Sequence, residues 1–218
     1  MGRIRLRLSK TDTAKYISHL DLMSLMSRAL QRACVKLKLS EGFNPHPYLS
    51  AALPLPVGCG SVCELLDFDA VLDPPFEDLP DQINDVLPVG VRILEVYTPE
   101  RKFSEITWIG MDCSLYYSGG VGRNIAEMLK ERFSAESIIV SKRTKRGISD
   151  IDIVPFIRDI EITGSDVVNL RAKVTAQNPS INPENLLDAI ERSDTGLTPD
   201  LVLFTRMEVF DGNLDVFR

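Results

Sequence analysis

Histidine is nearly absent from this chain, and cysteine and tryptophan are rare. The 218 residues include two histidines, four cysteines and one tryptophan. Cys59 and Cys63 are four residues apart, but no second close pair completes a zinc-binding pattern. We therefore expect reduced thiols, as is usual in the cytoplasm, and we expect no bound metal.

Long apolar runs and nucleotide-binding fingerprints are missing too. No stretch is long enough to span a bilayer, and the N-terminal residues alternate like a strand rather than forming a signal peptide. Gly119–Gly122 has glycines but does not match G-x-G-x-x-G, so a flexible turn is favoured over a phosphate cradle. These absences predict a cytoplasmic protein that stays out of the membrane and carries no cofactor.

Charge is distributed unevenly along the chain. Residues 1–50 contain nine basic and three acidic residues, whereas the whole chain has a net charge of −6, so the remainder carries −12. One interpretation is a basic face that meets a polyanion, and the other is neutralisation of one part of the chain by the other. The basic turn Lys142–Arg146 leaves the same two possibilities open, a solvated turn or a polyanion contact.

Periodicity predicts an α+β protein made of two ferredoxin-like (βαββαβ) domains, the second with an extra β-hairpin. We place the first domain at residues 1–100 and the second at 101–218. Strict alternation over Arg3–Ser9 indicates a half-buried strand whose Ile4, Leu6 and Leu8 face the helices. We expect Arg3, Arg5 and Arg7 on the other, open face, where Arg–Asp pairs across the strands are favoured over nucleic-acid binding. The other expected strands of the first domain are 35–39, 48–53, 62–72 and 91–97, with helices from residue 18 and over 76–86. In the second domain we expect strands at 108–117, 138–142, 150–154, 160–162, 167–176 and 201–210, with helices after residue 122 and over 183–192.

The two histidines occupy constrained positions. Ser18 is a helix-capping residue with Asp21 three positions later, which puts His19 at the first helical position. His46 lies between Pro45 and Pro47, which restrict the backbone around it. Both histidines are candidate functional groups, whereas Ser18 and Asp21 are explained by capping.

The predicted topology allows the helix start and the Pro-rich loop to converge at one end of the first sheet. Free helix N–H groups, a lysine, two imidazoles, an amide and an aromatic ring would suit a phosphate and a base. Two imidazoles could also support acid–base cleavage of RNA, so His19 and His46 are the catalytic candidates. The candidate RNA-binding residues are Lys15, Tyr16, His19, Arg28, Asn44 and His46.

Three segments, Lys15–Met23, Ser40–Pro47 and Ala52–Gly58, resemble the uncharacterised radical-SAM-linked protein family, and the resemblance extends over essentially the whole chain. Ser24 departs from that pattern, in which a basic residue follows the methionine. The resemblance implies a partner that is a radical SAM, cobalamin-binding protein, and it supplies no established catalytic residue. A weaker similarity in element order links the chain to CRISPR repeat-processing endoribonucleases, but the glycine-rich C-terminal loop of those enzymes is missing.

Three functions remain open from the sequence. The chain could be a non-catalytic accessory module that binds structured RNA such as tRNA or rRNA. It could instead be a protein–protein adaptor for a radical SAM enzyme. A lower-ranked alternative is an endoribonuclease-like hydrolase that uses His19 and His46.

Overall fold

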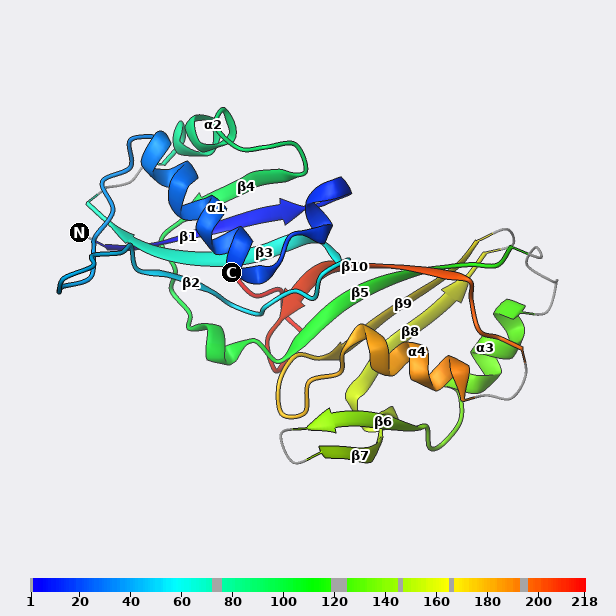
Figure 1. The fold of residues 1–218 in the computed structure, drawn as a ribbon. Helices are drawn as coiled ribbons and strands as arrows, with labels where there is room; N and C mark the ends of the chain where they lie inside the picture. The colour runs from blue at the N-terminus through cyan, green and yellow to red at the C-terminus, as the bar shows by residue number, and fades with distance from the viewer. Residues whose placement is uncertain (1, 72–75, 119–124, 145–146, 165–166, 193–195) are drawn as a thin grey trace. The chain divides into compact units, whose positions relative to one another are not determined.

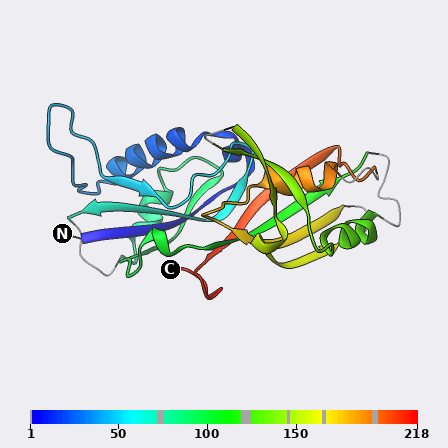
Figure 2. The ribbon, with the colours of Figure 1, turned by 90° about the horizontal axis from the view of Figure 1, so that it is seen from below.

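The computed structural model describes residues 2–71, 76–118, 125–144, 147–164, 167–192 and 196–218. The chain divides into two compact units, Met1–Glu105 together with Arg218, and Ile106–Phe217. Each unit combines helices with an antiparallel sheet (Figures 1 and 2). The protein is therefore a mixed α+β structure.

The described residues of the first unit form four strands and two α-helices. Its elements are β1 (Gly2–Lys10), a 3₁₀ helix (Asp12–Tyr16), α1 (His19–Arg32), β2 (Leu49–Ala51), β3 (Gly60–Ala70), α2 (Leu79–Asn84), β4 (Val91–Tyr97) and a second 3₁₀ helix (Phe103–Glu105). The strands lie in the order β4–β1–β3–β2, and each neighbouring pair is antiparallel. The first and third strands are thus the central pair.

The second unit repeats this strand order and adds a hairpin. Its elements are β5 (Trp108–Tyr116), α3 (Ile125–Phe133), β6 (Ile139–Thr144), β7 (Gly147–Asp152), a 3₁₀ helix (Val154–Phe156), β8 (Ile157–Thr163), β9 (Val168–Thr175), α4 (Pro183–Glu191) and β10 (Leu201–Phe210). The main sheet has the order β10–β5–β9–β8, while β6 and β7, as far as the structure describes the chain, pair only with each other.

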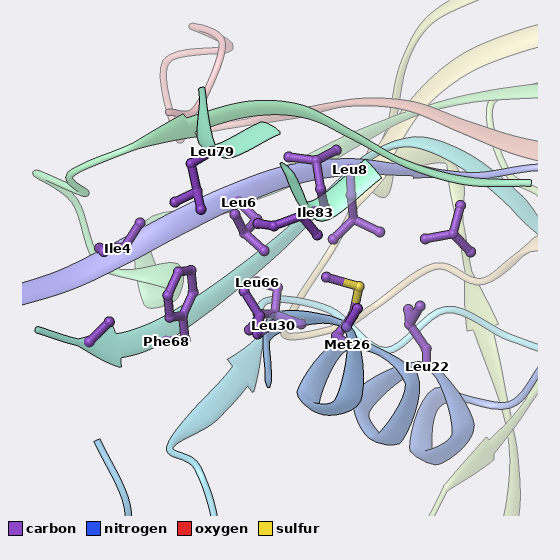
Figure 3. Close-up of a cluster of buried hydrophobic side chains, with 14 of the residues drawn as sticks. Ile4, Leu6, Leu8, Leu22, Met26, Leu30, Leu66, Phe68, Leu79 and Ile83 are labelled. Carbon is purple, nitrogen blue, oxygen red and sulfur yellow. The ribbon is translucent and has the colours of Figure 1, made fainter. Parts of the chain in front are cut away.

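The core of the first unit lies between one face of its sheet and the two helices. Ile4, Leu6 and Leu8 of β1 are buried and pack with side chains of α1 and α2, as Figure 3 shows. Leu66 and Phe68 of β3 join the same cluster. The prediction drawn from the alternation of Arg3–Ser9 is confirmed, because a strand with period two presents every second side chain to the same face.

The expected strand at Val35–Leu39 is wrong. Cys34, with a φ of 56°, ends the helical segment, and within the described residues the segment that follows makes only single bridges, Leu37 to Ala70 and Leu39 to Pro47. The edge strand forms later, as the three residues of β2. Alternating apolar residues fit an extended segment, but they do not specify how long the segment stays beside its partner.

The prediction of an open face carrying Arg3, Arg5 and Arg7 needs correction at Arg5. This residue is only 1% exposed, and its guanidinium donates to both carboxylate oxygens of Asp67, at 2.7 and 3.0 Å. It also donates to the carbonyl of Arg101 and lies 4.3 Å from the centre of the Phe103 ring. The segment after β4 therefore covers the sheet at this point and buries the ion pair.

We predict that Asp67→Asn destabilises the protein much more than Asp69→Asn. Removing the charge of Asp67 leaves a buried guanidinium without its counter-charge, which costs roughly 3–5 kcal/mol. Asp69 pairs with Arg3, two residues further along the same two strands, but the Arg3 side chain is 61% exposed. Such an exposed pair contributes at most about 1 kcal/mol. Urea unfolding followed by circular dichroism measures both variants, and equal losses would contradict the assigned burial.

Candidate functional site

The start of α1 is built as its sequence predicts. Ser18 is the N-cap, and its hydroxyl oxygen accepts the backbone N–H of Asp21 at 3.1 Å. The same hydroxyl donates to the Asp21 carboxylate at 2.7 Å. His19 is the first residue of the helix and is partly exposed. The capping roles of Ser18 and Asp21 are confirmed.

Lys15 and Tyr16 lie just before this helix, at the end of the sheet where β1 finishes. The carbonyl of Lys15 accepts from the Lys10 ammonium at 3.2 Å and from the Gly58 backbone N–H at 2.9 Å. The Lys15 ammonium lies 5.1 Å from the centre of the Tyr16 ring, which is well exposed. A lysine at the end of β1 thus fixes the chain that leads into α1.

His46 is held in place by Ser40, a residue that sequence reasoning missed. The His46 Nδ1 atom lies 2.9 Å from the Ser40 hydroxyl and 3.3 Å from the Asn44 carbonyl. The Ser40 hydroxyl also accepts the His46 backbone N–H, and the Ser40 backbone N–H donates to the His46 carbonyl. These bonds close the loop on both sides of the imidazole. The sequence signal for this arrangement was a serine six residues before a histidine that is flanked by prolines.

His19 and His46 do not share a site. The segment after α1 bonds to the end of β3, where the Val71 N–H donates to Lys36 and the Lys38 N–H donates to Asp69. In the register of the sheet, Asp69 faces Arg3 at the start of β1. The 14 residues of α1 therefore run back along the sheet for about 21 Å. Figures 1 and 2 show the loop before β2 at the end where the chain begins. The expected convergence of Lys15 and His19 with Asn44 and His46 is wrong.

A pocket of about 190 Å³ adjoins His46. Charged side chains from the central strands and an aromatic ring from the loop meet in it. Its lining residues are Arg3, His46, Pro47, Tyr48, Leu49, Ser50, Asp67, Phe68 and Asp69.

Cationic and aromatic side chains gather on the same loop. The Lys38 ammonium lies 5.6 Å from the centre of the half-exposed Tyr48 ring. Phe43 is fully exposed near the tip, after Gly42, whose φ of 124° is one that glycine adopts readily. One exposed ring is ordinary, but this loop carries two exposed rings, together with exposed lysines and a hydrogen-bonded imidazole. We call these side chains the basic–aromatic surface, made of Lys36, Lys38, Phe43, His46 and Tyr48.

The other basic residues of the N-terminal segment have different surroundings. Arg3, Arg5 and Arg7 pair with Asp69, Asp67 and Glu95. These pairs support internal neutralisation for β1. Arg28 is exposed on α1 and lines a hollow of about 690 Å³ together with Asp21, Ser24, Leu25, Gln31 and Arg32.

Several predicted features add no further site. Gly119–Gly122 lies outside the described residues, as do Lys145 and Arg146 of the basic turn. Within the described ranges, no group of three or more His, Cys, Asp or Glu side chains could hold a metal ion. No helix in that part of the chain is long and apolar enough to cross a membrane.

The fold and this surface define a two-unit α+β protein with a candidate binding loop. Residues 3–183 match the model of the family described as uncharacterised proteins conserved in bacteria, DUF2344. The chain belongs to this family.

A likeness in fold links this chain to a solved structure. A chain of a Cbf5-Nop10-Gar1 complex is 10% identical, with a TM-score of 0.53, over 94% of this chain and 48% of that chain. This protein thus spans about half the length of that neighbour. A protein of unknown function from Galdieria sulphuraria is 9% identical, with a TM-score of 0.22, over 94% of this chain and 98% of that one. No curated protein matches in sequence.

We predict that Ser18→Ala destabilises the protein by about 1 kcal/mol, because the first turn of α1 loses a bond to a free N–H. Ser24→Ala is the matched control, since this serine is exposed within the same helix and alanine favours helix formation. Thermal melts of the two variants give the comparison, and a loss for Ser24→Ala as large as that for Ser18→Ala would refute the capping role.

Proposed function

We propose that this protein is a non-catalytic RNA-binding module that contacts structured RNA through the basic–aromatic surface. The observation that carries the proposal is the Lys38 ammonium against the half-exposed Tyr48 ring, with a fully exposed Phe43 at the tip of the same loop. Proteins recognise unpaired RNA by stacking bases on aromatic rings and by placing cations along the backbone. A loop with both groups exposed offers both kinds of contact.

The charge of the surface supports RNA over an apolar partner. Lys36 and Lys38 are exposed and follow α1 directly, and neither forms an ion pair among the described residues. Binding to phosphates releases condensed counterions, so the affinity of such a surface falls as salt rises. Of the residues expected from the sequence, His46 and Asn44 belong to this loop, whereas Lys15, Tyr16 and His19 lie at the other end of the sheet.

We further propose that each unit is a ferredoxin-like module, the second with β6 and β7 inserted. In both units the first and third of the four sheet strands are neighbours at the centre, and a helix follows the first strand. Such an arrangement leaves the edge strand and its preceding loop accessible, which is where β2 and the basic–aromatic surface lie.

The structure bears differently on the two alternative functions, an endoribonuclease and an adaptor for a radical SAM enzyme. An endoribonuclease that uses His19 and His46 together loses its basis, because catalytic groups must reach the same substrate within hydrogen-bond distance. A radical SAM, cobalamin-binding partner rests on the family resemblance, and co-purification with such a protein would test it.

We predict that Lys38→Gln weakens RNA binding and makes it less sensitive to salt. Each lost phosphate contact should reduce the slope of log affinity against log salt by about 0.7–0.9. Fluorescence anisotropy with labelled tRNA over a salt series measures both quantities. Lys130→Gln is the control, because it removes an equal charge from an exposed position on α3.

Two results would count against RNA binding by this surface. The first is the absence of salt-sensitive binding to tRNA and to total RNA by the unaltered protein. The second is an equal effect of Lys38→Gln and Lys130→Gln, which would indicate a general response to net charge.

A further inference from the structure

The pocket beside His46 has the composition of a site for one unpaired base. We propose that it binds a single guanine of the RNA, and that the Asp69 carboxylate selects that base. This inference rests on the proposed RNA-binding function, and it adds the identity of the base and the residue that reads it.

The size of the pocket favours part of a polymer. Its volume of about 190 Å³ is below the roughly 300–1,000 Å³ of sites that enclose a whole drug-sized ligand. A planar base that remains attached to its strand needs only a small recess. The basic–aromatic surface adjoins the recess through His46 and Tyr48, so the rest of the strand has cations and rings to lie against.

The carboxylates of the pocket differ in availability. Asp67 is buried, and both of its oxygens bind Arg5. Asp69 binds Arg3 through Oδ1 at 3.2 Å, and 21% of its side chain is exposed. A carboxylate has about four acceptor positions on its two oxygens. Asp69 is therefore the acceptor that a base in the pocket can reach.

Guanine is the base that matches a carboxylate. Its Watson–Crick edge presents two adjacent donors, N1–H and the N2 amino group, which can bind the two oxygens together. Adenine and cytosine present one amino donor beside a ring acceptor, and uracil presents one donor between two carbonyls. A bidentate contact to a base is worth about 1–3 kcal/mol of discrimination, or tenfold for each 1.4 kcal/mol.

His46 and Tyr48 supply the remaining contacts of the base. Ser40 and Asn44 engage Nδ1 of His46, and among the described residues no bond is formed by Nε2, so this atom is available to a ligand. The Tyr48 ring is half-exposed and lines the pocket, where it can stack on the face of the base. The bonds to Ser40 and Asn44 thereby hold the imidazole before the RNA arrives.

The test measures the affinity of the protein for single-stranded RNAs of about 12 nucleotides. This length is within the usual site size of folds that bind single-stranded nucleic acids. The three probes repeat UUG, UUA or UUI, where inosine lacks the 2-amino group of guanine. We expect the UUG probe to bind about tenfold tighter than the UUA probe, with the inosine probe between them. Fluorescence anisotropy at one fixed salt concentration gives the three dissociation constants.

Two variants that break the same ion pair separate base reading from electrostatics. Asp69→Asn should bring the UUG and UUA affinities within about twofold of each other, because the double acceptor is lost. Arg3→Gln also removes the Arg3–Asp69 pair but keeps the carboxylate, so it should change the affinities of all probes by a similar factor and retain the preference for UUG. Melting curves confirm that both variants are folded.

The possible outcomes separate the guanine site from the RNA-binding function. Salt-sensitive binding with no preference for UUG, or a preference that survives Asp69→Asn, overturns the guanine site and leaves the RNA-binding function standing. A failure of all three probes and of tRNA to bind overturns both. Loss of the preference in Asp69→Asn, with its retention in Arg3→Gln, supports the guanine site.

Discussion

The antiparallel register of β1 on β3 is the constraint on which the first unit depends. It sets Ile4, Leu6 and Leu8 toward the helices and brings Arg5 opposite Asp67. Because side chains alternate along a strand, a slip of one residue would turn the arginines into the apolar core. The buried ion pair and the hydrophobic layer therefore specify the same register from opposite faces of the sheet. The position of Asp69 beside Arg3, and with it the pocket at the start of β1, follows from this register.

The parts of the structure that are local in sequence could be predicted, and the parts that depend on distant segments could not. The alternation of Arg3–Ser9 and the cap at Ser18 each involve residues within a few positions, so a short stretch of sequence is enough to predict them. The burial of Arg5 depends on Arg101 and Phe103, about 96 residues away. No periodicity in either segment indicates that they meet.

The candidate site follows this division only in part, because hydrogen bonds between residues close in sequence were missed there. The two prolines beside His46 correctly indicated a constrained loop, yet the bonds that orient its ring come from Ser40 and Asn44. The expected meeting of the two histidines failed because α1 returns along the full length of the sheet before the loop begins. A short sequence separation between two motifs is no guide to their distance when a helix of 14 residues lies between them.

On this protein, the residues proposed to supply affinity for RNA differ from those proposed to supply specificity. An arginine that is already bound to a carboxylate adds little long-range attraction for a polyanion, so the strand that looks most basic in the sequence is not the source of electrostatic binding. Lys36 and Lys38 lie outside the pocket, where contacts with phosphates can position a strand without reading it. The pocket is nearly balanced in charge and contains both acceptors and donors. Such an environment suits a neutral base better than a phosphate, because a free phosphate would lie against the carboxylates of Asp67 and Asp69.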